Sequence, residues 1–312
     1  MNSSGGVGGR QLQIIYEDGK CTGKDATDAA QKLVSIDKVK YIIGGICSSE
    51  AFSVVPVVTP ANVIAISPVA SAVKLSGMSP FFFRNNPSDA IAGAVLADYL
   101  AKSYKTVAII SELSDYSQGI RDVFAAHANK NGLTIVDNEN FDSSVTDFRS
   151  ILTKIKPLNP DVLITNPRVP KTVIIIAKQA RQLGINSQFA GSLFAGDPAM
   201  AAAGSFMDGF VSADLASLVG SQGQTFADKY KTKFGIAPNY PFYDGGAYDD
   251  VYILSQAISK VGDDAVKVKD YLHSMNSFTG TIGTYTFDQN GDMTGAGIVM
   301  EKISGGKVLP IQ

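Results

Sequence analysis

The sequence has only two histidines and no tryptophan, and the scarcity of histidine limits the catalytic chemistry that it can support. His127 and His273 lie in separate helix-like stretches without neighbouring metal ligands, so we expect both to have surface or capping roles. The sequence also contains no G-x-S-x-G motif, no metal-ligand cluster and no kinase signature. We therefore predict a protein that is not an enzyme and that uses no metal or cofactor.

Long apolar runs and an excess of charge are missing as well. No apolar run approaches the roughly eighteen residues that a membrane helix requires. Lys and Arg number 27 against 29 Asp and Glu, so the net charge of -2 gives no reason to expect binding to nucleic acid or to anionic lipid. The first ten residues lack the basic and apolar regions of a signal peptide, which fits either a cytoplasmic protein or a trimmed chain.

Cysteine is scarce too, with only Cys21 and Cys47 in the chain. Each follows a strand-like run, and the ends of neighbouring parallel strands come close enough for a disulfide. A bridge closing a loop of about 25 residues would add about 3 kcal/mol of stability in the chain-entropy model. It would also imply an oxidising compartment, whereas two free thiols would fit a cytosolic protein.

Strand-like and helix-like segments alternate along most of the chain, and this order predicts an α/β architecture with parallel sheets. The length of 312 residues is roughly twice that of an ordinary domain, so two lobes are expected. After Phe278 the pattern changes to short strands separated by Gly turns, which is typical of hairpins. The predicted strands are 12–16, 41–45, 63–66, 106–110, 133–136, 161–165 and 210–213. The predicted helices are 25–33, 90–100, 120–128, 173–183 and 246–261.

Three motifs resemble ligand-binding loops but are predicted to be turns. GGVGG at 5–9 precedes a strand, whereas phosphate-binding glycines follow a strand and open a helix. SGGK at 304–307 lacks the Ser or Thr that follows Lys in a P-loop. The DQNGD run at 288–292 begins like a calcium loop but lacks its glycine at position six, and its Asn-Gly pair favours a hairpin.

Polar residues follow several of the predicted strands. Ser48 comes after the 41–45 run and Ser71 after the 63–66 run, while Ser114 and Tyr116 follow the 106–110 run. In open α/β sheets, ligands bind outside the carboxyl ends of the strands. Helix N-termini there suit a carboxylate, and serine hydroxyls add donors without charge. Ser48 and Ser114 could equally be ordinary N-caps, or serve both purposes.

These segments resemble the type I periplasmic binding proteins of the branched-chain amino-acid importer family over almost the whole chain. Each matching motif is loose, but ten of them occur in the family's order and spacing. They are MNSSGG (1–6), DGKC (18–21), IGGICSSE (43–50), AISPVAS (65–71), FFRNNPSD (82–89), SDYSQG (114–119), FRSILTKIKPLNPDVLIT (148–165), FAGSLF (189–194), YDGGAYDDV (243–251) and TGTIGTYTFDQNGD (279–292).

The resemblance implies two Rossmann-like α/β lobes with parallel-sheet cores, joined by three hinge crossings and closing over a ligand. Residues 1–88 with 216–293 would form lobe 1, and residues 89–215 with 294–312 would form lobe 2. It also implies a disulfide that matches Cys21 and Cys47. Family members have a further strand and helix before the MNSSGG segment, so we expect either a trimmed chain or a repair such as pairing with another copy.

The resemblance also implies ligand-binding residues. Ser48 and Ser71 match positions whose hydroxyls bind the carboxylate of the ligand, with the backbone of Val69 and Ala70 nearby. Tyr116 matches an aromatic residue from the second lobe, and Tyr248 matches one near the far side of the pocket.

Two departures from the family bear on the ligand. Leu193 stands where amino-acid binders have a glutamate that neutralises the ammonium of the ligand, which argues against a simple amino acid because an unpaired buried ammonium is costly. Asp197 or Asp244 could supply the missing charge, although neither lies at the motif position. Leu193 and Phe194 suggest an apolar wall instead. The run Asn166-Pro167-Arg168 replaces small or aromatic residues, and Arg168 could clamp a second anionic group or be a solvated residue at the lip of the pocket.

The resemblance therefore predicts the solute-binding component of an ABC importer. It would act in the periplasm or on the outer face of the membrane, deliver its ligand to membrane permease subunits and have no nucleic-acid partner. The expected solute is a small carboxylate, either a branched-chain or aromatic amino acid or a related organic acid. A ligand-sensing domain of a receptor or regulator, with the same fold, is the alternative.

Overall fold

The computed structural model describes residues 1–192, 197–215, 218, 220–295 and 297–311. The chain divides into two compact units, Met1–Ser88 with Ala216–Ala296 (unit 1) and Asp89–Leu215 with Gly297–Gln312 (unit 2). It passes between them three times, and the last passage follows residue 296, whereas the sequence placed it after residue 293.

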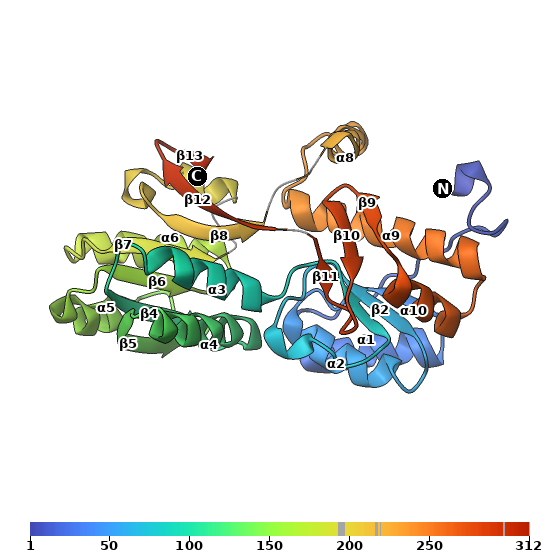
Figure 1. Ribbon diagram of the computed structural model, residues 1–312, viewed down its shortest axis with the longest axis horizontal. Helices are drawn as coiled ribbons and strands as arrows, with labels where there is room; N and C mark the ends of the chain where they lie inside the picture. The colour runs from blue at the N-terminus through green and yellow to red at the C-terminus, as the bar shows by residue number, and fades with distance from the viewer. Residues whose placement is uncertain (193–196, 216–217, 219, 296, 312) are drawn as a thin grey trace. The chain divides into compact units, whose positions relative to one another are not determined.

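Unit 1 is built on a parallel sheet of three strands in the order β1-β2-β3, accompanied by a small antiparallel sheet in the order β11-β10-β9. Helices α1 and α2 cover one face of the parallel sheet, whereas α9 and α10 lie on the other side (Figure 1). The elements of unit 1 are the 3-10 turns Asn2–Ser4 and Val73–Leu75, α1 (Gly23–Ser35), β1 (Tyr41–Ile43), α2 (Ser48–Val58), β2 (Ile64–Ser67), β3 (Phe82–Arg84), α8 (Gly220–Phe234), α9 (Pro241–Val261), α10 (Ala265–Ser274), β9 (Phe278–Gly280), β10 (Gly283–Phe287) and β11 (Met293–Thr294).

Unit 2 is built on one sheet of seven strands in the order β13-β12-β8-β7-β6-β4-β5. The five strands from β4 to β8 are parallel, and β12 and β13 are added antiparallel at one edge. Its elements are α3 (Asp89–Leu100), β4 (Thr106–Glu112), α4 (Asp115–Lys130), β5 (Thr134–Phe141), α5 (Arg149–Ile155), β6 (Val162–Asn166), α6 (Pro170–Gln182), β7 (Gln188–Ser192), α7 (Pro198–Ala202), β8 (Val211–Leu215), β12 (Ile298–Ser304), β13 (Lys307–Pro310) and the 3-10 turns Lys156–Leu158 and Ser205–Met207.

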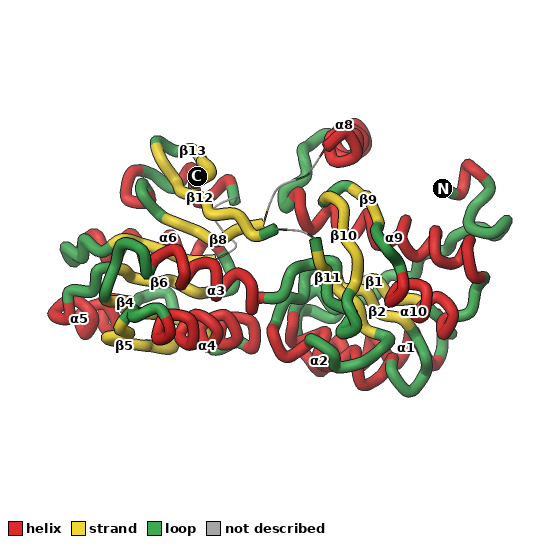
Figure 2. The backbone as a smooth tube through the Cα atoms, in the orientation of Figure 1, coloured by secondary structure: helices red, strands yellow, loops and turns green. Residues whose placement is uncertain are grey.

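The apolar runs of unit 2 are buried on both faces of its sheet, as expected for parallel strands. Along β4, Val107 and Ile109 pack with residues of α3 and α4, while Ala108 and Ile110 pack with residues of α5 and α6. This alternation with a period of two places helices on both sides of the sheet, as the tube in Figure 2 also displays. The predicted α/β class with parallel-sheet cores is therefore confirmed.

The predicted strand at 12–16 is wrong. The segment has no strand partner among the described residues, and Ile14, Ile15 and Tyr16 are 54%, 38% and 84% exposed. Its backbone is engaged only at Leu12, where the Asn2 amide donates to the Leu12 carbonyl and accepts from the Leu12 N–H, both at 2.8 Å. A strand forms through ladder hydrogen bonds to a neighbour, so the β-branched run alone does not make one here.

The three motifs predicted to be turns are all turns. Val7 and Arg10 exchange backbone hydrogen bonds across the first, and Ser304 pairs with Lys307 across the β12–β13 hairpin. Gly291 lies between β10 and β11 with φ +77°, and a Cβ there would meet the Phe82 carbonyl oxygen at 2.1 Å. Glycine is therefore required by both conformation and space.

In the described part of the chain, no helix is long and apolar enough to cross a membrane.

Candidate functional site

The carboxyl ends of β1 and β2 carry the first group of candidate residues, and Ser67 joins the two loops that follow them. The Ser67 hydroxyl donates to the Gly45 carbonyl at 2.8 Å and accepts from the Ala70 amide at 2.9 Å. Gly45 has φ +71°, and a Cβ there would come within 3.1 Å of the Ala51 Cα in helix α2. The fully buried Ser67 was not among the predicted ligand contacts, and its role is to hold these loops together.

Ser48 and Ser71 lie in these two loops and differ in how their hydroxyls are used. Ser48 is the first residue of α2, after the N-cap Cys47, so the cap role considered for Ser48 belongs to Cys47. The Ser48 hydroxyl accepts from the Ala72 amide at 3.2 Å, which brings the segment of Ser71 next to the start of α2. Ser71 is 3% exposed, and its hydroxyl bonds to no residue that the structure describes. A buried donor of this kind suits an acceptor from a ligand.

The backbone groups predicted beside these serines are partly engaged within the protein. The Ala70 amide donates to Ser67, and the Val69 carbonyl accepts from the side-chain amide of the buried Asn86. In contrast, the amides of Ser48 and Ser49 at the start of α2 donate to no residue in the described ranges. The helix start and the Ser71 hydroxyl are therefore open donors at this edge of the sheet.

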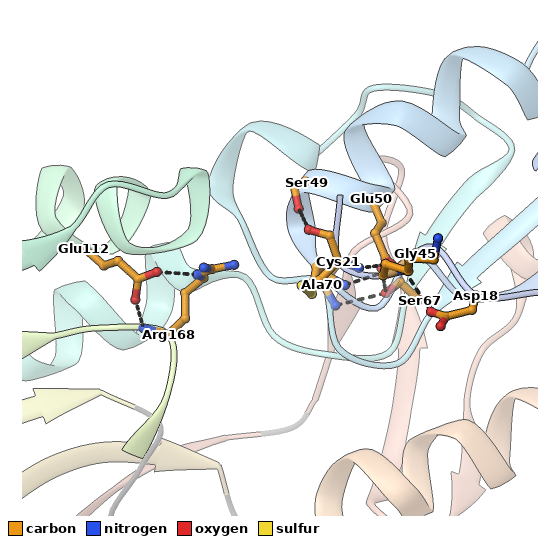
Figure 3. The surroundings of a disulfide bond; sticks show 11 residues. Asp18, Cys21, Gly45, Ser49, Glu50, Ser67, Ala70, Glu112 and Arg168 are labelled. Atoms are coloured by element: carbon orange, nitrogen blue, oxygen red, sulfur yellow. Dashed lines mark hydrogen bonds and ion pairs between the residues drawn. A yellow bond between two sulfur atoms is a disulfide. The ribbon is translucent and has the colours of Figure 1, made fainter. Parts of the chain in front are cut away.

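A disulfide and a buried carboxylate fix the start of α2 (Figure 3). Cys21 and Cys47 are bridged, with their Cα atoms 5.3 Å apart, as predicted. Glu50, 7% exposed, accepts from the Cys21 amide at 2.8 Å and from the Cys47 amide at 3.1 Å. A Cβ on Gly19 would meet the Glu50 carboxylate at 2.5 Å, so Gly19 leaves room for this contact. Sequence reasoning missed Glu50, although Glu at the third helical position is a known capping signal.

Arg84 supports the loop after Ser71, and sequence reasoning missed it as well. Its side chain is fully buried, with Nε 2.7 Å from an Asp292 oxygen and one Nη donating to the Ala72 carbonyl at 2.9 Å. The other Nη donates to the Ser76 hydroxyl at 2.9 Å. A buried arginine with its donors engaged in this way makes the segment from 72 to 76 rigid.

In unit 2, the carboxyl ends of β4 and β6 carry the second group of candidates. Ser114 is the N-cap of α4 and accepts from the Ser117 amide at 3.2 Å, and Tyr116 lies half-buried in the first turn of that helix. Asn166, at the end of β6, donates to the Ser117 carbonyl at 2.6 Å. Ser114 is thus a structural cap, and Asn166 uses its amide to position the helix that bears Tyr116.

Arg168 does not stand alone at this edge, because it is paired with the buried Glu112 at the end of β4 (Figure 3). Arg168 Nε lies 2.6 Å from Glu112 Oε1, and the Arg168 backbone N–H donates to Glu112 Oε2 at 2.8 Å. The carboxylate side chain is 4% exposed and the arginine side chain 39%. Neither terminal nitrogen of Arg168 bonds to a residue within the described ranges.

Tyr248 belongs to unit 1 and lies on α9, within a row of aromatic rings. Its ring centroid is 5.0 Å from that of Phe226 and 4.7 Å from that of Tyr252, and its hydroxyl donates to the Tyr252 hydroxyl at 3.0 Å. Burial, together with the hydrogen bond to Tyr252, raises the pKa of Tyr248 to about 12. The residue is therefore a neutral phenol, able to offer a ring face or an oxygen but no charge.

The remaining residues that bear on an ammonium partner are Leu193, Phe194, Asp197 and Asp244. Leu193 and Phe194 lie outside the described residues. Asp197 caps α7 by accepting from the Ala199 amide at 2.7 Å, and Asp244 accepts from the Tyr240 amide at 3.1 Å. Both carboxylates are thus used in helix starts.

The two histidines have hydrogen-bond partners within the protein. His127 lies on α4 with Nδ1 3.3 Å from an Asp98 oxygen, and its side chain is 37% exposed. His273, in the last turn of α10, faces the carbonyls of Asp288 and Pro80 at 3.1 and 3.0 Å. Among the described residues, no group of three or more His, Cys, Asp or Glu could hold a metal ion.

The chain forms two α/β units linked by three passages, with uncharged donors after the strands of one unit and an arginine after the strands of the other. This arrangement is that of a solute-binding protein of the periplasmic type. The sequence profile described as "Periplasmic binding protein" matches residues 1–307, and the chain belongs to this family.

Relatives and solved structures agree with this assignment. The leucine-, isoleucine-, valine-, threonine- and alanine-binding protein of Pseudomonas aeruginosa is 27% identical over 299 residues, covering 94% of this chain and 79% of that protein. A leucine-binding protein from Thermotoga maritima has a similar fold, with a TM-score of 0.89 and 23% identity over 100% of this chain and 90% of that one. A solute-binding protein from R. palustris in complex with benzoate has a TM-score of 0.85 and 20% identity, over 99% and 87% of the two chains.

Proposed function

We propose that the chain is the solute-binding component of an ABC importer, acting outside the cytoplasm and delivering a small carboxylate to membrane permease subunits. The observation that carries the proposal is the buried Ser71 hydroxyl beside the open start of α2. A helix N-terminus and uncharged hydroxyls favour an anion through N–H and O–H donors. The disulfide is consistent with an oxidising compartment.

The ligand is a branched-chain or aromatic amino acid or a related organic acid. Curated relatives include binders of leucine, isoleucine and valine, and one neighbouring structure holds benzoate. Within unit 1, the hydroxyls of Ser48 and Ser71 are the proposed contacts of the ligand. Val69, Ala70 and Tyr248 are proposed to lie near it. In unit 2 the proposed contacts are Tyr116, Asn166, Arg168 and Leu193. Binding without chemical conversion fits the family.

The test is ligand-dependent thermal stabilisation of the intact chain across amino acids, aromatic acids and other small carboxylates. A ligand present at 100 times its Kd stabilises the folded protein by about 2.7 kcal/mol. We expect Ser71→Ala to weaken binding of the best ligand by about tenfold, because the loss of one hydrogen bond to a charged group costs about 1.5–3 kcal/mol. Ser53→Ala, on helix α2 of the same unit and bonded to the Ser49 carbonyl, is the matched control and should bind normally.

A melting temperature that stays constant across the whole panel would contradict the proposal. Equal affinities of Ser71→Ala and Ser53→Ala would contradict the assignment of Ser71. A receptor or sensor with the same fold would bind ligand in the same way, and co-purification with permease subunits separates the two.

A further inference from the structure

The pair formed by Glu112 and Arg168 occupies the edge of the unit 2 sheet where a ligand binds in open α/β folds. Glu112 is the last residue of β4, and Arg168 follows the end of the adjacent β6 by two positions. The two strands are parallel neighbours, and Ser111 pairs with Asn166 in their last register position. The pair is thus fixed by the sheet itself.

The pair presents only hydrogen-bond donors to solvent. Each Glu112 oxygen already accepts from an N–H of Arg168, and 4% of the Glu112 side chain is exposed. Arg168 has used one of its side-chain nitrogens, while both terminal nitrogens bond to nothing in the described part of the chain and the side chain is 39% exposed. The accessible chemistry is therefore that of a guanidinium edge.

A guanidinium edge of this kind discriminates between ligands by charge. Its two terminal nitrogens match the two oxygens of a carboxylate and also suit a neutral oxygen acceptor. An ammonium brought to the same place would meet donors and a like charge, and the Glu112 carboxylate is covered by Arg168.

We infer that the Glu112–Arg168 pair determines the specificity of the binding protein, with Arg168 receiving a second oxygen-bearing group of the ligand. Glu112 acts as a positioning residue that holds the guanidinium in place. The ligand class that follows is an acid without an amino group, and a dicarboxylate satisfies the site best. This inference rests on the proposed function and narrows it, because amino acids then bind poorly.

The test compares acids of similar carbon skeleton that carry an added ammonium, an added carboxylate or neither. Hexanoate, L-norleucine and adipate form a six-carbon series, and 3-phenylpropanoate, L-phenylalanine and 3-(4-carboxyphenyl)propanoate form an aromatic series. Isothermal titration calorimetry gives the Kd of each for the intact chain. In at least one series we expect the diacid to bind most tightly and the amino acid most weakly, by about tenfold or more between the two.

Two variants and a control test whether the Glu112–Arg168 pair produces this order of affinities. Arg168→Gln should weaken binding of the diacid by about tenfold or more while changing the affinity for the amino acid little or increasing it. Because this variant leaves Glu112 buried without its partner, Glu112→Gln/Arg168→Gln removes both charges and retains two amides able to bond to each other. The double variant should bind diacid and amino acid with similar affinities. Arg149→Gln, which removes an exposed arginine of the same unit paired with Asp147, should keep the wild-type order.

The outcomes separate this inference from the proposed function. Tighter binding of the amino acids by the wild-type chain would overturn the inference and leave the proposed function intact. The same holds for a diacid-to-amino-acid ratio that is unchanged in the folded double variant. If no acid of either series or of the wider panel binds to the wild-type chain, the proposed function fails, and the inference fails with it.

Discussion

Asp250 is a carboxylate whose removal should stabilise the protein. It lies on α9 with no exposed surface, and no residue in the described ranges donates a hydrogen bond to either of its oxygens. Burial, and next the neighbouring charge of Asp249, raises the pKa of Asp250 well above its ordinary value of 3.8. The adjacent Tyr285 is also buried, and burial followed by the charge of Asp250 raises its pKa as well. The ionised form of Asp250 is therefore strongly disfavoured in the folded state.

The sign and size of the effect follow from linkage. Because the pKa of Asp250 is higher in the folded state, its ionisation does not lower the free energy of unfolding below pH 3.8, where both states hold the proton. As the pH rises, the unfolded chain releases its proton first, and the free energy of unfolding falls by about 1.4 kcal/mol per pH unit. The fall continues until the pH reaches the folded-state pKa, and at pH 7 it amounts to at most about 4 kcal/mol.

Asp250→Asn removes this penalty while keeping the shape of the side chain. We expect a gain of about 1–3 kcal/mol at pH 7, because the buried amide retains part of the desolvation cost. Each kcal/mol gained should raise Tm by about 2–4 °C for a unit of this size. Urea unfolding of wild type and variant between pH 4 and pH 8 should give curves that converge at low pH and separate as the pH rises. Asp28→Asn, which removes an exposed carboxylate of α1 in the same unit, should follow the wild type.

An Asp250→Asn variant that is no more stable than wild type at pH 7, or whose difference does not grow with pH, would refute the reasoning. Asp249→Ala offers the contrast. Asp249 accepts from the Thr281 amide at 2.8 Å and from the Ile282 amide at 3.3 Å, so its loss should destabilise the protein.

Three further predictions concern stability. Burial, together with the charge of Asp214, raises the pKa of Glu301 to about 6 from 4.5, so the stability contributed by its protonated form is lost between pH 4.5 and about 6. Glu301→Gln should therefore stabilise the protein at pH 7.5 and not at pH 4.5, by less than about 1 kcal/mol after allowance for solvent screening, and equal curves at both pH values would contradict this. Removing the disulfide as Cys21→Ser/Cys47→Ser should lower the free energy of unfolding by about 3 kcal/mol in denaturant titrations. Glu50→Gln should cost more in that disulfide-free chain than in the oxidised one, because the carboxylate alone then bridges residues 21 and 47, and strictly additive losses would argue against this coupling.

The fold follows from the sequence wherever a segment carries its own pattern. The 106–110 and 161–165 runs are buried on both faces and became β4 and β6, and the 246–261 stretch became part of α9. The prediction of a strand at 12–16 is wrong because the pattern specifies an apolar extended segment but cannot supply the neighbouring strand that would pair with it. The hairpins at the end of the chain were predictable because Asn-Gly and Gly-Gly pairs favour the required turns.

The site was less predictable, because its partners lie far apart in the sequence. Position after a strand indicated Ser48 and Ser71, and a departure from the family pattern indicated Arg168. Nothing in the sequence states that β4 and β6 are neighbours, and the contact of Arg168 with Glu112 depends on that order. Glu112 could have been noticed as a carboxylate that ends a buried apolar run, because such a charge requires a partner. Arg84 could have been noticed for the same reason, since it ends the strand β3 directly after Phe82 and Phe83.

The most direct test of the central claim is native mass spectrometry of the intact chain purified without denaturation, followed by release and identification of what it holds. The account predicts a bound small acid that carries a carboxylate and lacks an amino group, and a reduced bound fraction in Ser71→Ala. A retained ligand that has no carboxylate, or a chain that neither retains nor takes up any acid, would contradict it.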